Sequence, residues 1–240
     1  MSRGIYIALS GAVAQETALE TTATNLANSA SNGYQRVRPV FREVLSGATA
    51  RPGSGLHFAA IESTALDGSR GPLRSTGRSL DVAMPAGVYL GVSTPRGERF
   101  TRSGSLKVTA DGSLTAASGA RVEREDGQAI TVNAASDVTI TPDGRVVQDG
   151  ATVARLRLVK LDGSSLQHEG EGLLVARGAA PLPSEEALDV GMLEESNASV
   201  VGSMTDLVTA SRTFEAFQRM LETFGEIDRR VLSSVPTPTE

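Results

Sequence analysis

The chain has 240 residues, of which 40% are hydrophobic and 21% charged, and its formal net charge is −5. This length buries a full hydrophobic core and forms one large domain or two small ones. The acidic balance argues against a nucleic-acid partner, because neutralising phosphates requires a basic surface patch. The chain contains no cysteine, which excludes disulfides and thiolate metal sites.

The first twenty residues, MSRGIYIALSGAVAQETALE, combine one early charge with a short apolar run that glutamates soon follow. A cleavable secretory signal has a longer apolar core and a small-residue cleavage site. We therefore expect this segment to remain in the mature protein. No apolar run approaches the length that spans a bilayer, so membrane insertion is not expected.

A helix is predicted over residues 3–31, where apolar residues recur at spacings of three and four. They are Ile5, Leu9, Ala12, Leu19, Ala23, Leu26 and Ala30. Asn32-Gly33 predicts the C-cap, because both residues tolerate the left-handed conformation that ends helices. The stripe is narrow and rich in alanine, so a partner helix can approach closely, and the helix alone would be marginal in water. For Asn25 and Asn28, helix-end hydrogen bonding is favoured over contact with a ligand.

The middle of the chain is predicted to be a β domain preceded by a connector. Residues 34–60 are expected to be extended and then loose, since 46–60 are rich in Gly, Ala and Pro. Residues 61–188 contain six Asp-Gly pairs, a strong hairpin signal when alternating residues flank it. The pairs begin at Asp67, Asp111, Asp126, Asp143, Asp149 and Asp162. Each carboxylate stands nearly alone, whereas a calcium loop supplies several, so turns are favoured over a metal site.

After a connector at 189–199, the helical period returns over 200–235, and the tail 236–240 follows it. Asn197 or Ser199 can cap this helix. Its apolar residues form a seam with heptad spacing over about four heptads. The seam contains Leu207, Ala210, Phe214, Phe217, Leu221, Phe224 and Val231, with Asp228 as a break. Periodicity alone leaves two partners open for this seam, the β domain of the same chain or other helices.

Four motifs resemble the flagellar rod and hook protein family. NLAN followed by NGYQR is similar to its N-terminal motif, and EESNASVVGSMTDLVTASRTFEAFQRML to its C-terminal helix. GPLRSTGRSLDVAM (71–84) and GERFTRSGSLKVTADGSLTAASGARV (97–122) are similar to its β-domain pattern. The opening MSRGIYIALSGA and the modest length most resemble the proximal rod members. PAGVYLGV departs from the family, which continues after LDVAM with Gly-Asp-Gly and two aromatics.

The resemblance implies an α+β fold. The N- and C-terminal helices, at 1–33 and 200–235, would pair as a coiled-coil α domain, with an antiparallel all-β domain inserted between them. It also implies a structural subunit of the bacterial flagellar basal-body rod, which self-assembles into the axial drive shaft that transmits torque. The expected partners are other rod subunits and the flagellar export apparatus. The expected location is the basal body, assembled in the periplasm after type III export without a cleaved signal peptide.

The subunit interface is expected on the two terminal helices. The predicted interface residues are Leu9, Leu19, Asn25, Leu26, Asn28, Leu207, Phe214, Phe217, Leu221 and Phe224. No cofactor, metal or small-molecule substrate is expected for a protein that acts through packing.

Other interpretations stay open. A distal rod protein or a short hook-type axial protein has similar motifs. A secreted β-rich binding module or adhesin fits the middle segment but leaves both end helices unexplained. An enzyme is not expected, because His57 and His168 are the only histidines and neither lies in a recognisable nucleophile context. GEGLLV (170–175) does not complete a dinucleotide fingerprint.

Overall fold

The computed structural model describes residues 3–46, 56–178 and 180–234, and the chain forms two compact units. The first, which we call the helical unit, comprises Met1–Leu26, Arg38–Thr64 and Val200–Glu240. The second, the β unit, comprises Ala27–Val37 and Ala65–Ser199. The expected α+β fold is confirmed, with a helix toward each end of the chain and antiparallel strands between them.

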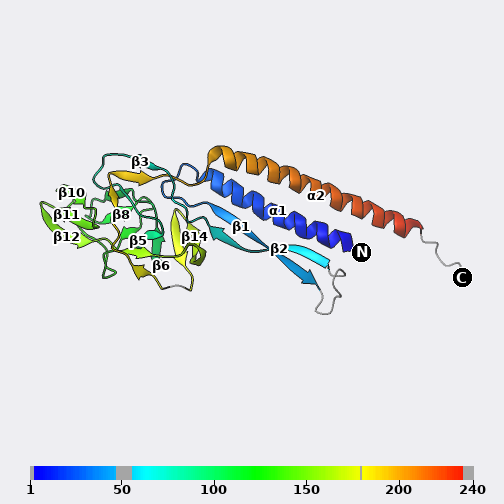
Figure 1. Ribbon diagram of the computed structural model, residues 1–240, viewed down its shortest axis with the longest axis horizontal. Coiled ribbons are helices and arrows are strands. Elements are labelled where there is room, and N and C mark those ends of the chain that lie inside the picture. The colour runs from blue at the N-terminus through cyan, green and yellow to red at the C-terminus, as the bar shows by residue number, and fades with distance from the viewer. Residues whose placement is uncertain (1–2, 47–55, 179, 235–240) are drawn as a thin grey trace. The chain divides into compact units, whose positions relative to one another are not determined.

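The helical unit contains two helices and a strand pair. The helices are α1 (Arg3–Ala27) and α2 (Val200–Ser234), and β1 (Val37–Ser46) pairs with β2 (Leu56–Leu66). Figure 1 shows α1, in blue, and α2, in orange, side by side and running in opposite directions. Threonine hydroxyls in both helices donate to the carbonyl four residues earlier, which satisfies these polar groups within the helix.

The first helix ends earlier than its sequence predicts. α1 stops at Ala27, six residues before the Gly33 of the predicted cap. A turn follows, in which the Ser31 N–H donates to the Asn28 carbonyl over 3.1 Å. Asn and Ser side chains compete for backbone hydrogen bonds, which favours turns over a continued helix. Gly33 does have a positive φ of 69°, but it is not the residue that ends the helix.

The segment expected to be extended, 34–45, contains strand β1 in the structure. The difference lies in the segment expected to be loose, 46–60, because β2 begins inside it at Leu56. Residues 47–55 lie outside the described part of the chain. The Gly, Ala and Pro content of 46–60 favoured a loop, but strand formation depends on pairing with another segment, which local composition does not report.

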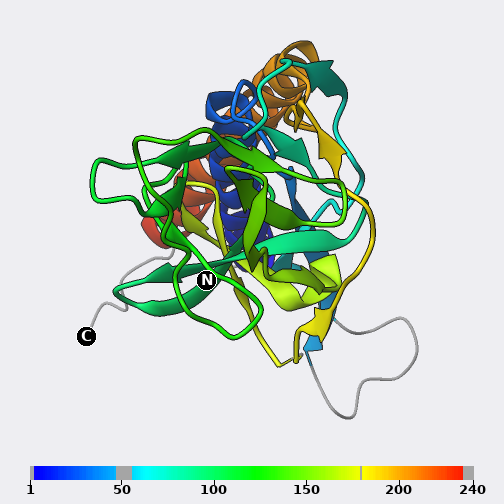
Figure 2. The same cartoon turned by 90° about the vertical axis from the view of Figure 1, so that its left-hand side faces the viewer.

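The β unit is built on a nine-stranded antiparallel sheet. Its strand order is β14-β15-β6-β5-β9-β8-β7, with β13 beside β5 and β16 beside β13. Three smaller sheets, β10-β11-β12, β17-β4 and β18-β3, complete the unit. Figure 2, which faces this unit, shows its short strands running in several directions.

The strands of the β unit are short. Their bounds are β3 (Leu73–Ser75), β4 (Val82–Ala83), β5 (Val88–Thr94), β6 (Gly97–Thr101), β7 (Leu106–Val108), β8 (Leu114–Ala116), β9 (Arg121–Val122), β10 (Val138–Ile140), β11 (Arg145–Gln148), β12 (Ala151–Arg155), β13 (Leu158–Lys160), β14 (Leu166–Gly170), β15 (Leu173–Ala176), β16 (Leu182–Pro183), β17 (Asp189–Val190) and β18 (Met192–Glu194). A single 3₁₀ turn, Gly163–Ser165, lies between β13 and β14.

The β unit has its own core, centred on strand β5. Val88, Leu90 and Val92 belong to a large apolar cluster, whereas Tyr89 belongs to a smaller one. This alternation follows the two-residue period of a strand whose two faces are both covered. The rest of the smaller cluster is Phe100, Val159, Leu161, Leu166 and Leu174.

Most of the Asp-Gly pairs form the predicted turns. In the Asp-Gly loops at 109–113, 124–128 and 141–145, the N–H of the first residue donates to the carbonyl of the fifth, and its carbonyl accepts from the N–H of the glycine. The loop at 116–120, which contains Ser118-Gly119, has the same pattern. The glycine of each has φ between 78° and 80°, as in a type I turn followed by a bulge. Asp149 and Gly150 both have positive φ and join β11 to β12.

Two Asp-Gly pairs are exceptions to the hairpin prediction. Gly68 and Gly163 are not among the glycines with positive φ. The Asp162 side chain instead accepts from the Ser164 N–H over 3.3 Å and caps the 3₁₀ turn. Asp67 follows β2 and pairs with Arg36. An Asp-Gly pair thus predicts a local chain reversal well. The short Asp side chain can also cap a helical turn instead.

Candidate assembly surface

The two terminal helices contact each other where α1 has no side chain. A Cβ built on Gly11 would lie 2.5 Å from the Cε1 atom of the Phe217 ring, so the ring rests directly on the α1 backbone. The buried residues of α1 are small, and α2 buries Ser203 and Ala210. Small residues allow two helices to approach closely, as the alanine-rich stripe of α1 predicts.

The predicted interface residues differ in exposure. Asn25 is buried, with 6% of its surface exposed, and Leu9 is 48% exposed. The other eight are half-buried: Leu19, Leu26, Asn28, Leu207, Phe214, Phe217, Leu221 and Phe224. The side chains of Asp228 and Val231 lie outside the described residues. At Phe217 the seam therefore contacts α1 of the same chain.

Apolar side chains on the outer faces of the helices form two further groups. We call Tyr6, Leu9 and Val13 the α1 patch, and Val200, Val201, Met204 and Val208 the α2 patch. Their side chains are 44% to 75% exposed. Apart from Leu9, sequence reasoning missed them, because it followed the single longest stripe of each helix. Their own spacing of three and four residues is the signal that would have found them.

Exposed charged residues follow both patches. On α1 they are Glu16 and Glu20. On α2 they are Arg212, Glu215, Arg219, Glu222 and Glu226, and the apolar Met220 and Ile227 are exposed in the same stretch. The charged side chains are suited to water, whereas the exposed apolar ones are suited to burial.

Asn197 joins three segments of the β unit that lie far apart in the sequence. Its Oδ1 accepts from the Arg36 N–H over 2.6 Å, and its Nδ2 donates to the carbonyls of Asp67 and Ser69, each over 2.9 Å. The side chain is therefore not a helix cap, and Ser199 is the residue that directly precedes α2. These bonds tie together the residue before β1, the residues after β2 and the segment that precedes α2.

A buried ion pair lies in the same part of the β unit. Arg102 donates from Nε to Glu194 over 3.2 Å, and its Nη1 donates to the carbonyls of Pro85 and Val88. The other carboxylate oxygen of Glu194 accepts from the Gly71 N–H over 3.0 Å. A buried charge is tolerated only when its hydrogen bonds are satisfied. This pair was not singled out by the sequence, because each partner lies in a different motif.

His168 holds the segment that follows α1. Its ring stacks on Tyr34 with centroids 4.9 Å apart, and its Nε2 lies 2.9 Å from the carbonyl oxygen of Gln35. Burial lowers the pKa of His168. The contact with Gln35 raises it, but by less. Burial also raises the pKa of Tyr34 to about 12. A neutral imidazole bonded to a carbonyl acts here as a packing group.

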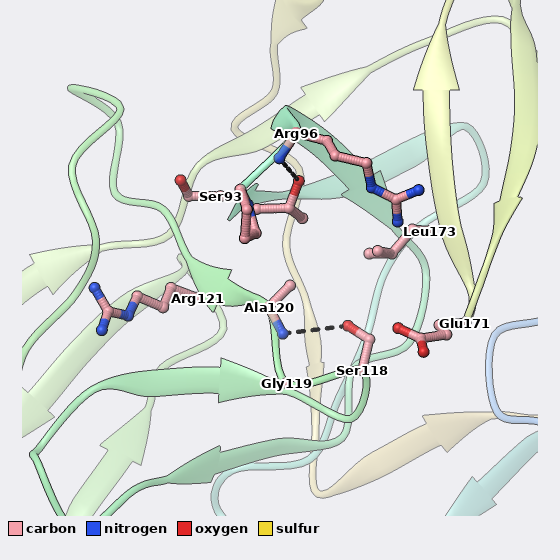
Figure 3. A pocket seen from close by; sticks show the side chains of 10 residues that line it. Ser93, Arg96, Ser118, Gly119, Ala120, Arg121, Glu171 and Leu173 are labelled. Atoms are coloured by element: carbon pink, nitrogen blue, oxygen red, sulfur yellow. Dashed lines mark hydrogen bonds between the residues drawn. The ribbon is translucent and has the colours of Figure 1, made fainter.

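A shallow pocket lies on the β unit (Figure 3). It is lined by Ser93, Thr94, Pro95, Arg96, Ser118, Gly119, Ala120, Arg121, Glu171 and Leu173. The Arg96 and Arg121 side chains point away from each other, and they lie 3.4 Å from Glu169 and 3.9 Å from Asp111. Cations that already face carboxylates and do not converge argue against an anion site.

In the part of the chain that the structure describes, no group of three or more His, Cys, Asp or Glu side chains could hold a metal ion. None of the helices there combines the length and the apolar character that crossing a bilayer requires.

Two family models match the chain. They are the flagellar basal body rod FlgEFG protein C-terminal, over residues 190–234, and the flagellar hook protein FlgE/F/G D1 domain, over residues 86–148. The first match covers all of α2, and the second covers much of the main sheet of the β unit.

Several relatives match over nearly the whole chain. The flagellar basal-body rod protein FlgF of Salmonella typhimurium is 32% identical over 252 residues, covering 96% of this chain and 97% of the relative. FlgF of Rhizobium meliloti is 30% identical over 237 residues, covering 96% and 97%. The rod protein FlgG of Bacillus subtilis is 28% identical over 258 residues, covering 95% and 97%. From this identity and coverage, the chain belongs to the flagellar basal-body rod protein family.

Proposed function

We propose that this chain is a structural subunit of the flagellar basal-body rod and that it joins the axial structure through the outer faces of α1 and α2. The observation that carries the proposal is the exposure of the apolar α1 and α2 patches in the part of the chain that the structure describes. Contiguous exposed apolar surface on an otherwise polar helix marks an interaction site. The relatives that match along the whole chain are named rod proteins, which supports the same assignment.

Within the rod, the proximal part is the proposed position. The FlgF relatives reach 30% and 32% identity, and the FlgG relative reaches 28%. A distal rod protein or short hook-type axial protein is the second candidate, favoured by the FlgG match.

The helices are proposed to pair as a coiled coil in the assembled rod. The Phe217 ring on Gly11 and the heptad spacing of the α2 seam support this arrangement. The predicted residues Leu207, Phe214 and Leu221 continue the same seam, and their partly exposed surfaces leave area for neighbouring subunits. Residues 1–33 and 200–235 would then act as the assembly domain, and 61–188 as a separately folded β domain.

The proposed mechanism is mechanical rather than chemical. The subunit would transmit torque through packed helices, with other rod proteins as partners and the flagellar export apparatus as its route to the periplasm. The buried, carbonyl-bonded His168 supports a role without catalysis, because a general base requires access to a substrate proton. No cofactor or small-molecule substrate enters this mechanism.

A deletion strain tests the proposal. Removing the gene should abolish swimming and stop assembly beyond the rod, and a plasmid copy should restore both. Immunoblots of purified basal bodies should contain the chain. The length of the rod remnant in electron micrographs separates the proximal from the distal position. A deletion strain that swims normally contradicts the assignment.

A further inference from the structure

Asp149 and Gly150 form the tip of the β11–β12 hairpin, where Gln148 lies opposite Ala151. Their φ angles of 51° and 79° are both positive, as in the type I′ turn that favours an Asp-Gly pair. Both residues are exposed. The turn therefore presents an Asp-Gly pair directly to water.

An Asp-Gly pair can rearrange without an enzyme. The glycine nitrogen attacks Cγ of the Asp carboxyl group, one carboxyl oxygen leaves as water, and a five-membered succinimide ring forms. Water then opens the ring at either carbonyl. Opening at Cγ restores Asp, whereas opening at the backbone carbonyl leaves the chain joined through Cγ, as isoaspartate. The water lost in the first step returns in the second, so the net reaction is an isomerisation that needs no oxidant or cofactor.

A folded chain can block this reaction in two ways. The attacking nitrogen must give up its proton, so an N–H that donates to a carbonyl is held back. The leaving oxygen must carry a proton, so a carboxylate that cations or hydrogen-bond donors keep ionised reacts slowly. All six Asp-Gly pairs lie in the part of the chain that the structure describes, so they can be compared on both points.

Three of the pairs are blocked at both atoms. Gly112, Gly127 and Gly144 each donate their N–H to the carbonyl three residues earlier, over 2.8 to 2.9 Å. The carboxylates of the same pairs each accept a side-chain hydrogen bond that lowers their pKa. The donors are Thr109 to Asp111, Arg124 to Asp126 and Thr141 to Asp143.

Two further pairs are blocked at the carboxylate. Asp67 forms an ion pair with Arg36 over 3.1 Å, and it also accepts from the Ser69 N–H over 3.1 Å. Asp162 accepts from the Ser164 hydroxyl over 2.7 Å, and this hydrogen bond lowers its pKa. Both carboxylates are thus held in their ionised form.

The Asn32-Gly33 pair reacts by the same route, with ammonia as the leaving group. Its attacking nitrogen is also blocked, because the Gly33 N–H donates to the carbonyl of Glu194 over 2.7 Å. The fold therefore protects this pair as well.

Asp149-Gly150 has neither kind of protection. Within the described residues, the Asp149 carboxylate accepts no hydrogen bond and faces no cation, and the Gly150 N–H has no acceptor. Ala151, Thr152 and Val153, which follow the turn, are exposed too. The turn can therefore reorient toward the ring geometry without moving a buried side chain.

We infer that Asp149 is the site at which the folded chain modifies itself by forming isoaspartate, and that the fold protects the other five Asp-Gly pairs and Asn32-Gly33. The inference is independent of the proposed function. The product keeps the mass and the charge of the chain but adds one backbone atom to the two-residue loop that sets the register of the β11–β12 hairpin.

Peptide mapping of the aged chain tests the inference. The purified natural chain is kept at neutral pH and physiological temperature for several weeks, and circular dichroism confirms that it stays folded. Trypsin releases Asp149 in Val146–Arg155, a peptide that contains no other Asp or Asn. Fragmentation in a mass spectrometer distinguishes the isoaspartyl from the aspartyl linkage. Isoaspartate should form at least about fivefold faster at Asp149 than at any other of the seven pairs, because a hydrogen bond that must break first raises the barrier.

Two variants and one solvent condition are the controls. Asp149→Asn keeps a pair suited to the type I′ turn and forms the same succinimide, so it should give isoaspartate faster than the natural chain. Asp149→Glu should give none at this position, because its ring would have six members. In guanidinium chloride the protecting bonds are lost, and all six Asp-Gly pairs should isomerise at similar rates.

Two results would overturn the inference. One is a second pair in the folded chain, Asn32-Gly33 included, that reacts as fast as Asp149-Gly150. The other is the absence of isoaspartate at Asp149 over a period in which the denatured chain forms it there.

Discussion

Arg102 and Glu194 form an ion pair inside the β unit in which 0% and 3% of the two side chains are exposed. The two residues belong to different sequence motifs and lie 92 positions apart. Glu194 also accepts from Gly71 through its side chain and from Gly33 through its carbonyl. One buried charge pair thus ties together the segment after α1, the segment after β2 and the segment before α2.

Arg102→Met should lower the free energy of unfolding of the β unit by about 3–5 kcal/mol, because it leaves Glu194 buried without a cation. Arg102→Met combined with Glu194→Leu should recover part of this loss, since two apolar side chains replace two charges. Urea denaturation of the full-length chain measures both. Equal stability of the single variant and the natural chain would show that the pair is not closed off from water.

Gly33→Ala should destabilise the β unit more than Gly77→Ala. Both glycines have φ of 69°, so both substitutions carry the same backbone strain, of about 1–2 kcal/mol. A Cβ on Gly33 would lie 2.4 Å from the carbonyl carbon and oxygen of Arg102, whereas a Cβ on Gly77 meets nothing within 4 Å. We expect an extra cost of at least about 2 kcal/mol for Gly33→Ala. Similar melting temperatures for the two variants would contradict the close contact.

The β unit should lose stability as the pH falls below about 6.5, the ordinary pKa of histidine. Burial lowers the pKa of His168 in the folded chain, so the unfolded chain binds a proton first. Stability due to the neutral ring is complete above the unfolded pKa and declines as the pH falls toward the folded one. His168→Phe keeps a ring against Tyr34 but removes the titration. Denaturation midpoints between pH 5 and 7.5 should depend on pH less steeply in this variant, and an unchanged slope would exclude His168 as the source.

The helix contact predicts different effects for two glycine substitutions. A helical Gly→Ala change with room for the added methyl group normally stabilises by about 0.5–1 kcal/mol, and a Cβ on Gly225 meets nothing within 4 Å. On Gly11 the same methyl group would strike the Phe217 ring. Gly225→Ala should therefore preserve swimming, whereas Gly11→Ala should reduce it. Normal swimming of the Gly11→Ala strain would argue against close packing of α1 on α2.

The parts of the fold that the sequence predicts well are local ones. The two terminal helices follow from apolar spacing, and the loops at Asp111, Asp126 and Asp143 follow from the tolerance of glycine for positive φ. The sequence predicts the end of α1 too late, because Gly33 is typical of a helix C-cap. In the structure α1 ends at Ala27, and the positive φ of Gly33 accompanies a close approach to the Arg102 backbone.

The parts that sequence reasoning missed depend on distant partners. Pairing of β1 with β2, the bridge made by Asn197 and the Arg102–Glu194 pair all join segments whose proximity only the folded chain creates. The α2 patch was missed for a different reason. In the sequence, apolar residues outside the main seam of a helix do not by themselves indicate a second apolar face. Their exposure in the structure shows that they form one.

The central claim is that α1 and α2 form the assembly domain while the β unit folds on its own core, and Phe217→Asp tests it most directly. The variant places a carboxylate against the α1 backbone at Gly11. The contact that the structure describes there offers it no cation, so its burial is unfavourable. Gln218→Asp, at the exposed neighbouring position, is the control.

Swimming and recovery of the chain in purified basal bodies are measured together with a thermal melt. The melt is followed by the near-ultraviolet circular dichroism of the tyrosines, two of the three of which, Tyr34 and Tyr89, lie in the β unit. The account predicts that Phe217→Asp abolishes swimming and incorporation while the β-unit melt stays within about 2 °C of the natural chain, and that Gln218→Asp swims. Normal incorporation of Phe217→Asp into motile flagella would contradict it.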